Sequence, residues 1–273
     1  QPKRMYPVST SRFGTGDKPR SYKTPLGQLQ VVEVIGQGLP PGAKLKARLP
    51  TGEIGDDQSI PYAAGPGFAA LATGDVSTAR RVAVFLRRIW EAQPDLDPET
   101  GLPARFHYDW SRARQAPTTA FDPKDAFWYV VDNQADRNQR WTIGGIAAGF
   151  LCRLYLADPR PEDLDLARRY QAFSMAATPA QFKYGPVCKS GWGSSLLYQI
   201  TGEPQYEAWT YPMGAWFVEH QDAAGFWPAI GGGAEGRGAE SQLPLGNLIH
   251  NALEFAMHLD TIIAGLTSRP ILE

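Results

Sequence analysis

The stretch 73-TGDVSTARRVAVFLRRIWEAQ-93 has a counterpart later in the chain, 201-TGEPQYEAWTYPMGAWFVEHQ-221. Each copy begins with Thr-Gly and an acidic residue, continues for the length of a helix and ends at Gln, so that both ends are displaced by the same number of residues. A third copy lies between them, because residues 154–158 (LYLAD) align with residues 197–201 (LYQIT). Self-similarity at a regular spacing is typical of a helix–turn–helix unit that is repeated along a chain.

The individual helices of this repeat predict two layers. Residues 76–93 place their apolar side chains on one stripe and most of their arginines off it, which indicates an outer helix with one buried face. Residues 139–157 and 244–266 are apolar around most of their circumference and contain Gly and Ala, as expected of inner helices. We therefore expect residues 65–273 to form a mainly α domain, an α/α toroid whose inner helices surround a cavity.

Residues 1–60 have a different composition. Short β-rich runs, such as residues 30–35 (QVVEVI), alternate with Gly- and Pro-containing turns, which predicts a β-rich segment. Residues 53–66 are rich in Gly, Asp and Pro and are interpreted as the linker to the helical domain.

Charge and composition restrict the partners. The 27 Lys and Arg residues balance 28 Asp and Glu residues, so the formal charge of −1 predicts no nucleic acid partner. The longest apolar run, residues 143–156, is shorter than the ~20 residues that a membrane span needs. Cys152 and Cys188 are interpreted as inert core thiols. A small, weakly charged or apolar substrate is expected, while the oligomeric state and the cellular location stay open.

The segment 214–227 (GAWFVEHQDAAGFW) contains a motif that narrows the choice of helical fold. It resembles the QW repeat of squalene and terpenoid cyclases, except that Met213 replaces the usual basic residue. Residues 188–192 (CKSGW) are similar to the Cys-x-Ser-x-Trp that opens an inner helix in protein prenyltransferases. This resemblance implies an α/α toroid of the terpenoid cyclase and prenyltransferase superfamily, in which Gln221 caps helix ends and Trp227 is structural. The helix hairpins of sugar-processing (α/α) barrels have a similar pattern and remain an alternative.

A second resemblance concerns the beginning of the chain. Residues 5–11 (MYPVSTS), 14–16 (GTG), 21–27 (SYKTPLG) and 50–53 (PTGE) resemble the opening of an L,D-transpeptidase catalytic domain. The Ser-His-Gly-Cys motif that carries that family's chemistry does not occur in the chain. We therefore expect no transpeptidase activity and interpret residues 1–60 as a remnant, a fusion or a capping β element.

Motifs for metals and for cation formation are missing. Terpene cyclases use an Asp-x-Asp-Asp acid or an Asp-rich magnesium motif, and neither is present. The acids at 95–97 and 163–165 lie at helix entries, where capping and the helix dipole explain them. A prenyltransferase-like zinc site would have Cys188 and His250 as ligands, but Pro186 stands where that family has Asp, so too few ligands can be named. We expect no metal and no cofactor.

The candidate site follows from the ring geometry. In a ring of hairpins the inner helices run in the same direction, so their first turns meet at one mouth. The residues of these first turns are Trp141, Lys189, Trp192, Asn247 and His250. Gly-rich residues 231–238 are interpreted as a flap that brings Glu235 to the mouth.

An irregular insertion at residues 94–137 contains His107, Tyr108 and Asp109. Loops that interrupt a repeat are frequent places for function. We expect His107 or Asp109 to act as a base, with Lys189 stabilising a developing anion and His250 as a further acid or base. Tyr108, Trp141, Trp192, Asn247 and Glu235 are expected to bind substrate. An alternative is that the insertion holds only β-hairpins with packed rings.

Two further histidines are given no catalytic role. His220 is interpreted as a helix-end residue, and His258 as either exposed or part of the core.

These features favour a toroid enzyme that performs acid–base cyclisation, isomerisation or elimination on a small hydrophobic metabolite. Two alternatives stay open. One is a carbohydrate-active (α/α) barrel, a lyase or hydrolase, which needs paired carboxylates. The other is a non-catalytic binding or scaffold module of the cell envelope, whose ring would be plugged by side chains.

Overall fold

The computed structural model describes the backbone of residues 21–24, 27–31, 47–48, 57–136, 139–179, 181, 188–227 and 245–272, and the side chains of residues 58–136, 139–179, 181, 189–227 and 252–272. The chain divides into two compact units, Gln1–Asp57 and Gln58–Glu273. The first unit contains an antiparallel sheet of β1 (Ser21–Thr24), β2 (Gly27–Val31) and β3 (Ala47–Arg48), in that order. The predicted strand at residues 30–35 is described as far as Val31, at the end of β2.

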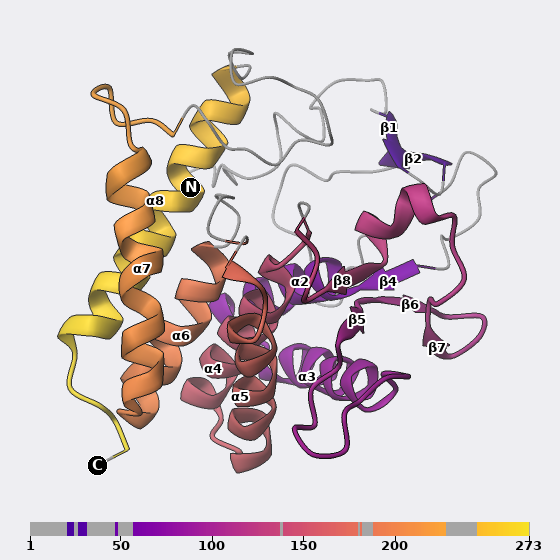
Figure 1. Cartoon of the computed structure of the whole chain (residues 1–273), viewed down its shortest axis with the longest axis horizontal. Coiled ribbons are helices and arrows are strands. Elements are labelled where there is room, and N and C mark those ends of the chain that lie inside the picture. Colours follow the sequence, from indigo (N-terminus) through magenta and orange to yellow (C-terminus); the bar gives the residue numbers. More distant parts are fainter. Residues whose placement is uncertain are drawn as a thin grey trace, which may run out of the picture. The chain divides into compact units, whose positions relative to one another are not determined.

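The second unit is mainly helical (Figure 1). Its helices are α2 (Ile60–Ala72), α3 (Val76–Glu91), α4 (Thr142–Ala157), α5 (Pro161–Met175), α6 (Cys188–Thr201), α7 (Pro204–His220) and α8 (Leu245–Thr267). The inner helices α2, α4, α6 and α8 pack side by side in a row. The outer helices α3, α5 and α7 each pack on the inner helix that precedes them in the sequence. The mainly α prediction is confirmed. Closure of the row into a toroid stays a prediction.

The turns of the sequence repeat have the same local structure. Gly74 and Gly202 follow α2 and α6 with φ angles of 78° and 67°, in the left-handed region that favours glycine. The preceding threonines, Thr73 and Thr201, each donate a side-chain hydrogen bond to the carbonyl four residues earlier in the helix. The repeated Thr-Gly sequence is therefore a helix stop, and it ends two inner helices in the same way.

Glycines allow the inner helices to approach closely. A Cβ atom at Gly145 in α4 would overlap the backbone of Lys189 in α6, and one at Gly265 in α8 would overlap Ser195 in α6. Farther along, Gly149 packs against the ring of Trp192. The contacts advance along both helices of each pair, so α4, α6 and α8 run in the same direction, as the ring argument expects. The starts of α4 and α6 consequently lie at one end of the array.

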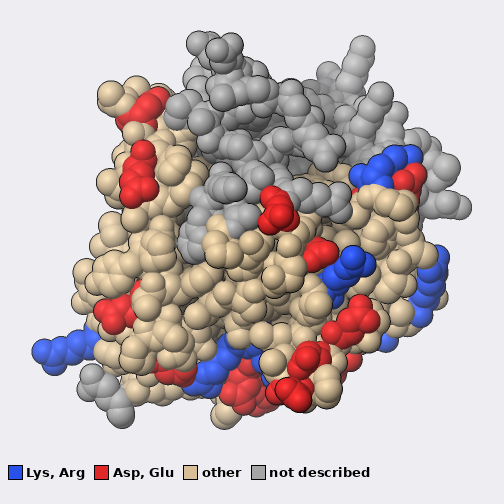
Figure 2. Space-filling view, viewed as in Figure 1, with Lys and Arg blue, Asp and Glu red and all other residues tan. Residues whose placement is uncertain are grey.

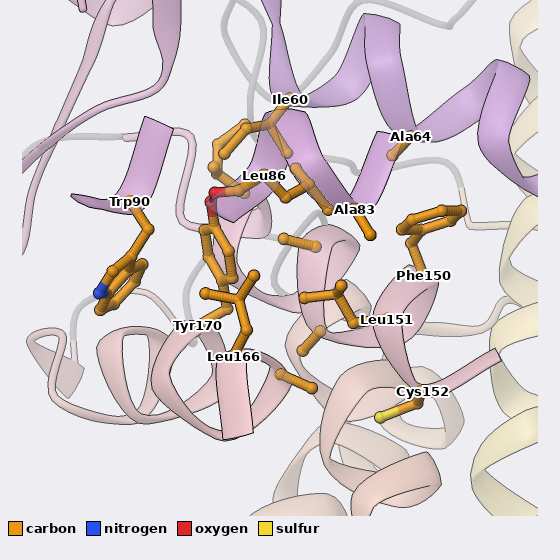
Figure 3. Packing of buried hydrophobic residues seen from close by; sticks show 14 of the residues in the cluster. Ile60, Ala64, Ala83, Leu86, Trp90, Phe150, Leu151, Cys152, Leu166 and Tyr170 are labelled. Carbon is orange, nitrogen blue, oxygen red and sulfur yellow. Dashed lines mark hydrogen bonds between the residues drawn. The ribbon is translucent and has the colours of Figure 1, made fainter. Parts of the chain in front are cut away.

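The main hydrophobic core lies between α2, α3, α4, α5 and α6 and combines large rings with Leu, Ile and Ala side chains (Figure 3). Tyr170 of α5 points toward α3 and donates a hydrogen bond of 2.8 Å to the carbonyl of Leu86. The rings of Trp90 and Tyr170 meet edge to face at 4.7 Å, and Phe106 packs against both. This is the buried face that the periodicity of residues 76–93 predicts. Cys152 is buried in the same core, and its burial raises the pKa of the thiol.

The predicted linker at residues 53–66 is wrong in its second half, because α2 begins at Ile60. Pro61 occupies the first turn of α2, where the missing amide hydrogen is tolerated, and Pro66 lies inside the helix. Ala63, Ala64 and Gly67 bury their side of the helix, with Gly67 against the Phe150 ring of α4. Packing outweighs the weak helix propensity of Gly65, Pro66 and Gly67.

The insertion at residues 94–137 folds as short strands around a 3-10 helix. Its elements are β5 (Arg105–His107), β6 (Asp109–Ser111), β7 (Ala116–Pro117), the 3-10 helix η1 (Pro123–Trp128) and β8 (Val130–Asp132). β5 pairs with β8, while β6 lies between β7 and β4 (Asp57–Ser59). Phe106 is paired with Val131 and reaches the helical core. The insertion is thus anchored to the helices by its rings.

The QW-like segment joins α7 to α8. Trp227 is buried, donates a hydrogen bond to the carbonyl of Phe217 in the last turn of α7, and packs on Phe255 of α8. The side chain of Gln221 donates instead to the carbonyl of Gly225 in the following turn. The predicted packing role of Trp227 is therefore confirmed, but the bond to the helix end comes from Trp227, whereas Gln221 closes the turn. Within the described part of the chain, no helix has the length and apolarity to cross a membrane.

Candidate acid–base cluster between the inner helices

Helix α6 lies at the centre of the array and positions the candidate site. It packs on α4, α7 and α8 and more lightly on α5, and its residues from Ser190 to Leu197 are buried on every side. Small side chains make this possible, because Gly191 meets Met213 of α7 and Gly193 meets Gln171 of α5. The first turn of α6 is therefore held between neighbouring helices, with Lys189 in its second position.

Lys189, Glu254 and His258 form a charged cluster between α6 and α8. The Lys189 ammonium is ion-paired with Oε1 of Glu254, and the Nε2 atom of His258 lies 3.5 Å from the same oxygen. That second separation is at the outer limit for a hydrogen bond, so it is treated as a charge contact. Glu254 and His258 are one turn apart on α8 and share one helix face.

The imidazole of His258 is buried, with 1% of its side chain exposed. No described donor or acceptor lies within hydrogen-bonding distance of its Nδ1 atom. A buried ring nitrogen without a partner is costly, since the group has lost its water. Nδ1 of His258 is therefore a buried donor or acceptor to which no described group forms a hydrogen bond.

Burial and neighbouring charges together lower the pKa values of both Glu254 and His258. Burial opposes ionisation of Glu254, but the contact with His258 and the charge of Lys189 outweigh it and hold the pKa of Glu254 well below its ordinary value. Burial is also the largest influence on His258, and together with Lys189 it lowers the pKa of that imidazole, against the opposing effect of Glu254. At neutral pH the cluster consequently contains a carboxylate and an uncharged imidazole.

Aromatic rings adjoin the cluster. Trp192 stacks on Phe68 of α2 at a centroid distance of 4.7 Å, and its ring centroid lies 5.0 Å from that of His258. Trp192, one turn after Lys189, thus links α2 and α8 across α6. A charged cluster beside stacked rings has the mixed polar and apolar character of small-molecule sites.

The other buried polar groups of α6 have structural partners. Ser190 accepts hydrogen bonds from Gln171 of α5 and Trp209 of α7, and the hydroxyl of Ser194 bonds to Thr210 of α7 at 2.6 Å. These bonds fasten the outer helices to α6. Among the described side chains of α6, those on the Lys189 side are the ones that combine with ionisable groups of another inner helix.

The predicted site residues of the insertion are held within their own hairpins. The ring Nδ1 of His107 lies 3.1 Å from the carbonyl of Thr118, and the hydroxyl of Thr118 donates to Asp109 at 2.7 Å. The backbone of His107 exchanges two hydrogen bonds with the side chain of Gln93 at the end of α3. Burial lowers the pKa of His107. These contacts explain both residues structurally, and a role as base stays a prediction.

Tyr108 belongs to an aromatic group around Arg140. The Tyr108 hydroxyl donates to the carbonyl of Phe127, and burial raises the pKa of the phenol. The Arg140 guanidinium lies over Trp128 at 4.3 Å and over Phe127 at 5.2 Å, within cation–π range. Trp141 follows as the buried N-cap residue of α4. Tyr108 and Trp141 are thus brought to the same end of α4.

The remaining predicted residues are only partly described. Asn247 and His250 lie in the first turns of α8, one or two turns before Glu254, and their side chains are outside the described residues. Glu235 and the Gly-rich segment 231–238 lie entirely outside them. The predicted meeting of these groups with Lys189 therefore stays a prediction.

Of the two acidic pairs predicted at helix entries, only residues 163–165 lie at one, because residues 95–97 belong to a turn at which no described helix begins. Asp163, in the first turn of α5, is buried and ion-paired with Arg80 of α3. Asp97 accepts backbone hydrogen bonds from Glu99 and Thr100 in a turn. Among the described residues, no three His, Cys, Asp or Glu side chains are grouped as metal ligands would be.

A shallow recess of about 210 Å³ lies between the outer helices α3 and α5. Its lining residues are Arg87, Trp90, Glu91, Glu162, Asp165, Leu166 and Arg169. It belongs to the outer layer of the array, whereas the cluster lies in the inner layer.

Glu254 and His258 are the residues that sequence reasoning missed. His220 does end α7, as predicted, and His258 proves to be a core residue. A signal was present in the sequence, because Glu254 and His258 are four residues apart in a predicted inner helix, a spacing that places both on one face. Comparison of the chain with protein-family models, with curated proteins and with solved structures returns no match.

Proposed function

We propose that residues 58–273 form an enzyme of the α/α-toroid type that performs acid–base cyclisation, isomerisation or elimination on a small hydrophobic metabolite. The supporting observation is the Lys189–Glu254–His258 cluster beside the rings of Trp192 and Phe68. Buried ion pairs contribute little to stability compared with apolar packing of the same volume. Ionisable groups with shifted pKa values next to an apolar wall are, in contrast, typical of active sites.

In this proposal His258 is the base. The carboxylate of Glu254 favours the tautomer with the proton on Nε2, which leaves the lone pair of Nδ1 free to accept a proton. Nδ1 removes a proton from a carbon next to a substrate carbonyl, the electron pair of that C–H bond forms a C=C bond to the carbonyl carbon, and the π electron pair of the carbonyl moves onto its oxygen. Lys189 stabilises the resulting negative charge. Return of the proton to a different carbon completes an isomerisation, and loss of a leaving group from the same anion gives an elimination.

The non-catalytic alternative is favoured by one observation of its own. Trp192 packs between Phe68 and His258, so side chains occupy the space between α2 and α8 at that level. A scaffold or binding module has its interior filled in this way. The carbohydrate-active alternative requires a second carboxylate at a set distance from the first, and Glu254 is the carboxylate that the described side chains contribute to the cluster.

A deuterium exchange screen tests the proposal. The protein is incubated in D₂O with a panel of prenyl aldehydes and unsaturated ketones, beside incubations without protein, and separately with xylan and alginate. Deuterium incorporation into carbon positions of a small hydrophobic compound, measured by mass spectrometry, is the expected result. New reducing or unsaturated sugar ends would favour the carbohydrate-active alternative. If neither exchange nor sugar cleavage occurs, the proposed enzyme function is wrong and the domain is a binding or scaffold module.

A further inference from the structure

Arg140 directly precedes the N-cap residue of α4 and is half-buried. Every other half-buried arginine among the described residues is ion-paired with a carboxylate, and these are Arg80, Arg87 and Arg168. Figure 2 shows acidic and basic side chains next to one another over α3 and α5, the helices that carry these three arginines. No described carboxylate lies within ion-pairing distance of Arg140. A guanidinium that is partly removed from water without gaining a negative partner is costly, so a bound anion would stabilise it.

Aromatic rings hold this guanidinium in place. Its central carbon lies 4.3 Å from the ring centroid of Trp128, 5.2 Å from that of Phe127 and 6.0 Å from that of Tyr108. The ring faces attract the positive charge, but they offer no oxygen to its N–H groups. No described oxygen accepts a hydrogen bond from Arg140 either. The side chain is thus fixed by its surroundings, while its hydrogen-bond donors are left for a ligand.

The first turn of α4 adds a second donor. The indole of the N-cap residue Trp141 cannot accept a hydrogen bond, and the turn contains no acidic side chain. Thr142 follows with 8% of its surface exposed, and its hydroxyl forms no hydrogen bond with a described group. Because the Cα–Cβ bonds of a helix tilt toward its N-terminus, this side chain is directed to the end at which Arg140 lies. A guanidinium and a hydroxyl at the positive end of a helix favour an oxyanion.

Charge and shape narrow the oxyanion to a carboxylate. A guanidinium and a carboxylate are both planar, and they form paired hydrogen bonds. Lys124 in η1 and Arg105 in β5 already have acidic partners, so the unbalanced charge is the single one of Arg140. Trp128 keeps 40% of its surface exposed beside the guanidinium and offers an apolar surface to the rest of the ligand. A singly charged carboxylate on an apolar body therefore fits better than a doubly charged phosphate.

We propose that Arg140, Thr142 and the exposed part of Trp128 form a binding site for a small apolar monocarboxylate. The carboxylate accepts hydrogen bonds from the guanidinium and the hydroxyl, and the apolar body packs on the indole. The site lies at the end of the array where α6 also begins, since Gly145, a little later in α4, packs on the backbone of Lys189. The side chains of the acid–base cluster take no part in holding the carboxylate, so the site goes beyond the proposed reaction and is tested independently of it.

Titration calorimetry with simple acids tests the site. The probes are hexanoate, phenylacetate and 3-phenylpropionate, each compared at neutral pH with its uncharged primary amide. At least one acid should bind, and at least tenfold more tightly than its amide, because only the acid supplies the missing negative charge. Equal affinity of each acid and its amide, or no saturable binding of any of the acids at about 10 mM, overturns the proposal. Hexyl phosphate that binds more than tenfold more tightly than hexanoate overturns the assignment to a carboxylate.

Substitutions locate the site. Arg140→Gln should weaken binding of the acid at least tenfold, and Thr142→Val, which removes only the hydroxyl, about threefold. Arg88→Gln is the matched control, because Arg88 also lies over an indole, 4.9 Å from the ring centroid of Trp110, but is exposed on α3. This variant should bind the acid as the wild type does. Circular dichroism confirms that each variant is folded. Unchanged affinity in Arg140→Gln, or an equal loss in Arg88→Gln, contradicts the proposed site.

Discussion

The ammonium group of Lys189 in α6 is paired with the carboxylate of Glu254 in α8, and the two side chains are only 21% and 23% exposed. Residues far apart in the sequence thereby place opposite charges between two inner helices, next to the buried imidazole of His258. The stability and the proposed chemistry of the domain both depend on this contact.

Removing the charge of Glu254 is expected to destabilise the domain. Glu254→Gln leaves the Lys189 ammonium largely covered without its counter-charge, which should cost about 1.5–3 kcal/mol of unfolding free energy in urea titrations. Glu203→Gln is the matched control. Glu203 is paired with Arg168 between α5 and α7, where both are about a third exposed, and the expected loss is below about 1 kcal/mol. Equal losses in the two variants would show that the Glu254 pair is an ordinary surface contact.

Stability is expected to fall on acidification, and His258 should carry part of the effect. Its pKa is lowered from the ordinary value of 6.5 in the folded state. Below pH 6.5 the unfolded chain therefore binds a proton that the folded chain does not, so stability is lost as the pH falls and regained as it rises. Glu254, whose pKa is also lowered, acts in the same direction at lower pH.

Melting temperatures between pH 8 and pH 5 measure this dependence. His258→Gln should flatten the curve near pH 6 but not abolish its slope, because the pKa of His107 is lowered as well. A wild-type melting temperature that rises on acidification would contradict the burial of a neutral imidazole.

The sequence predicts the helical repeat because two kinds of information agree there. The stripe of residues 76–93 fixes the buried face of α3, and the repeated Thr-Gly fixes the ends of α2 and α6. The start of α2 was missed because Pro61, Gly65 and Pro66 have the composition of a linker. Their helical conformation follows from tertiary packing, which a local pattern does not contain.

The candidate site was predicted less completely, for a related reason. Lys189 was singled out from its place in the first turn of an inner helix, but its partner is ten residues into α8 rather than in the first turn. The position of α8 along α6 depends on where Gly191 and Gly265 allow the two helices to approach closely. Such an offset is a property of packing, and no spacing within one helix encodes it.

Close packing of α4 on α6 is expected to be intolerant of a single methyl group. Gly145→Ala directs a Cβ atom into the backbone of Lys189, which cannot move aside as a side chain would. A loss of about 1–3 kcal/mol from overpacking is expected in urea titrations. In Gly214→Ala the added methyl meets only the Ile262 side chain at 3.3 Å, so better helix propensity should limit any loss to below roughly 1 kcal/mol. A neutral Gly145→Ala would contradict the described contact.

Trp227 is expected to be a main stabilising residue of the α7–α8 pair. Trp227→Ala removes a buried indole that packs on Phe255 and bonds to the carbonyl of Phe217, at a cost of roughly 3–5 kcal/mol. Gln221→Ala removes only an exposed hydrogen bond within the turn, with an expected cost of about 1 kcal/mol. Chemical denaturation of the two variants should give this order, and the reverse order would reassign the motif.

The proposed chemistry is tested most directly by deuterium exchange with a compound that the wild-type chain converts. The exchange rate is measured for His258→Gln, Lys189→Met and the control Glu203→Gln, each at a temperature where the protein is fully folded. If His258 is the base and Lys189 stabilises the anion, the first two variants should lose at least 100-fold in rate, a typical contribution of acid–base catalysis, while the control keeps the wild-type rate. Unchanged exchange in His258→Gln and Lys189→Met would contradict the assignment of the cluster as the active site.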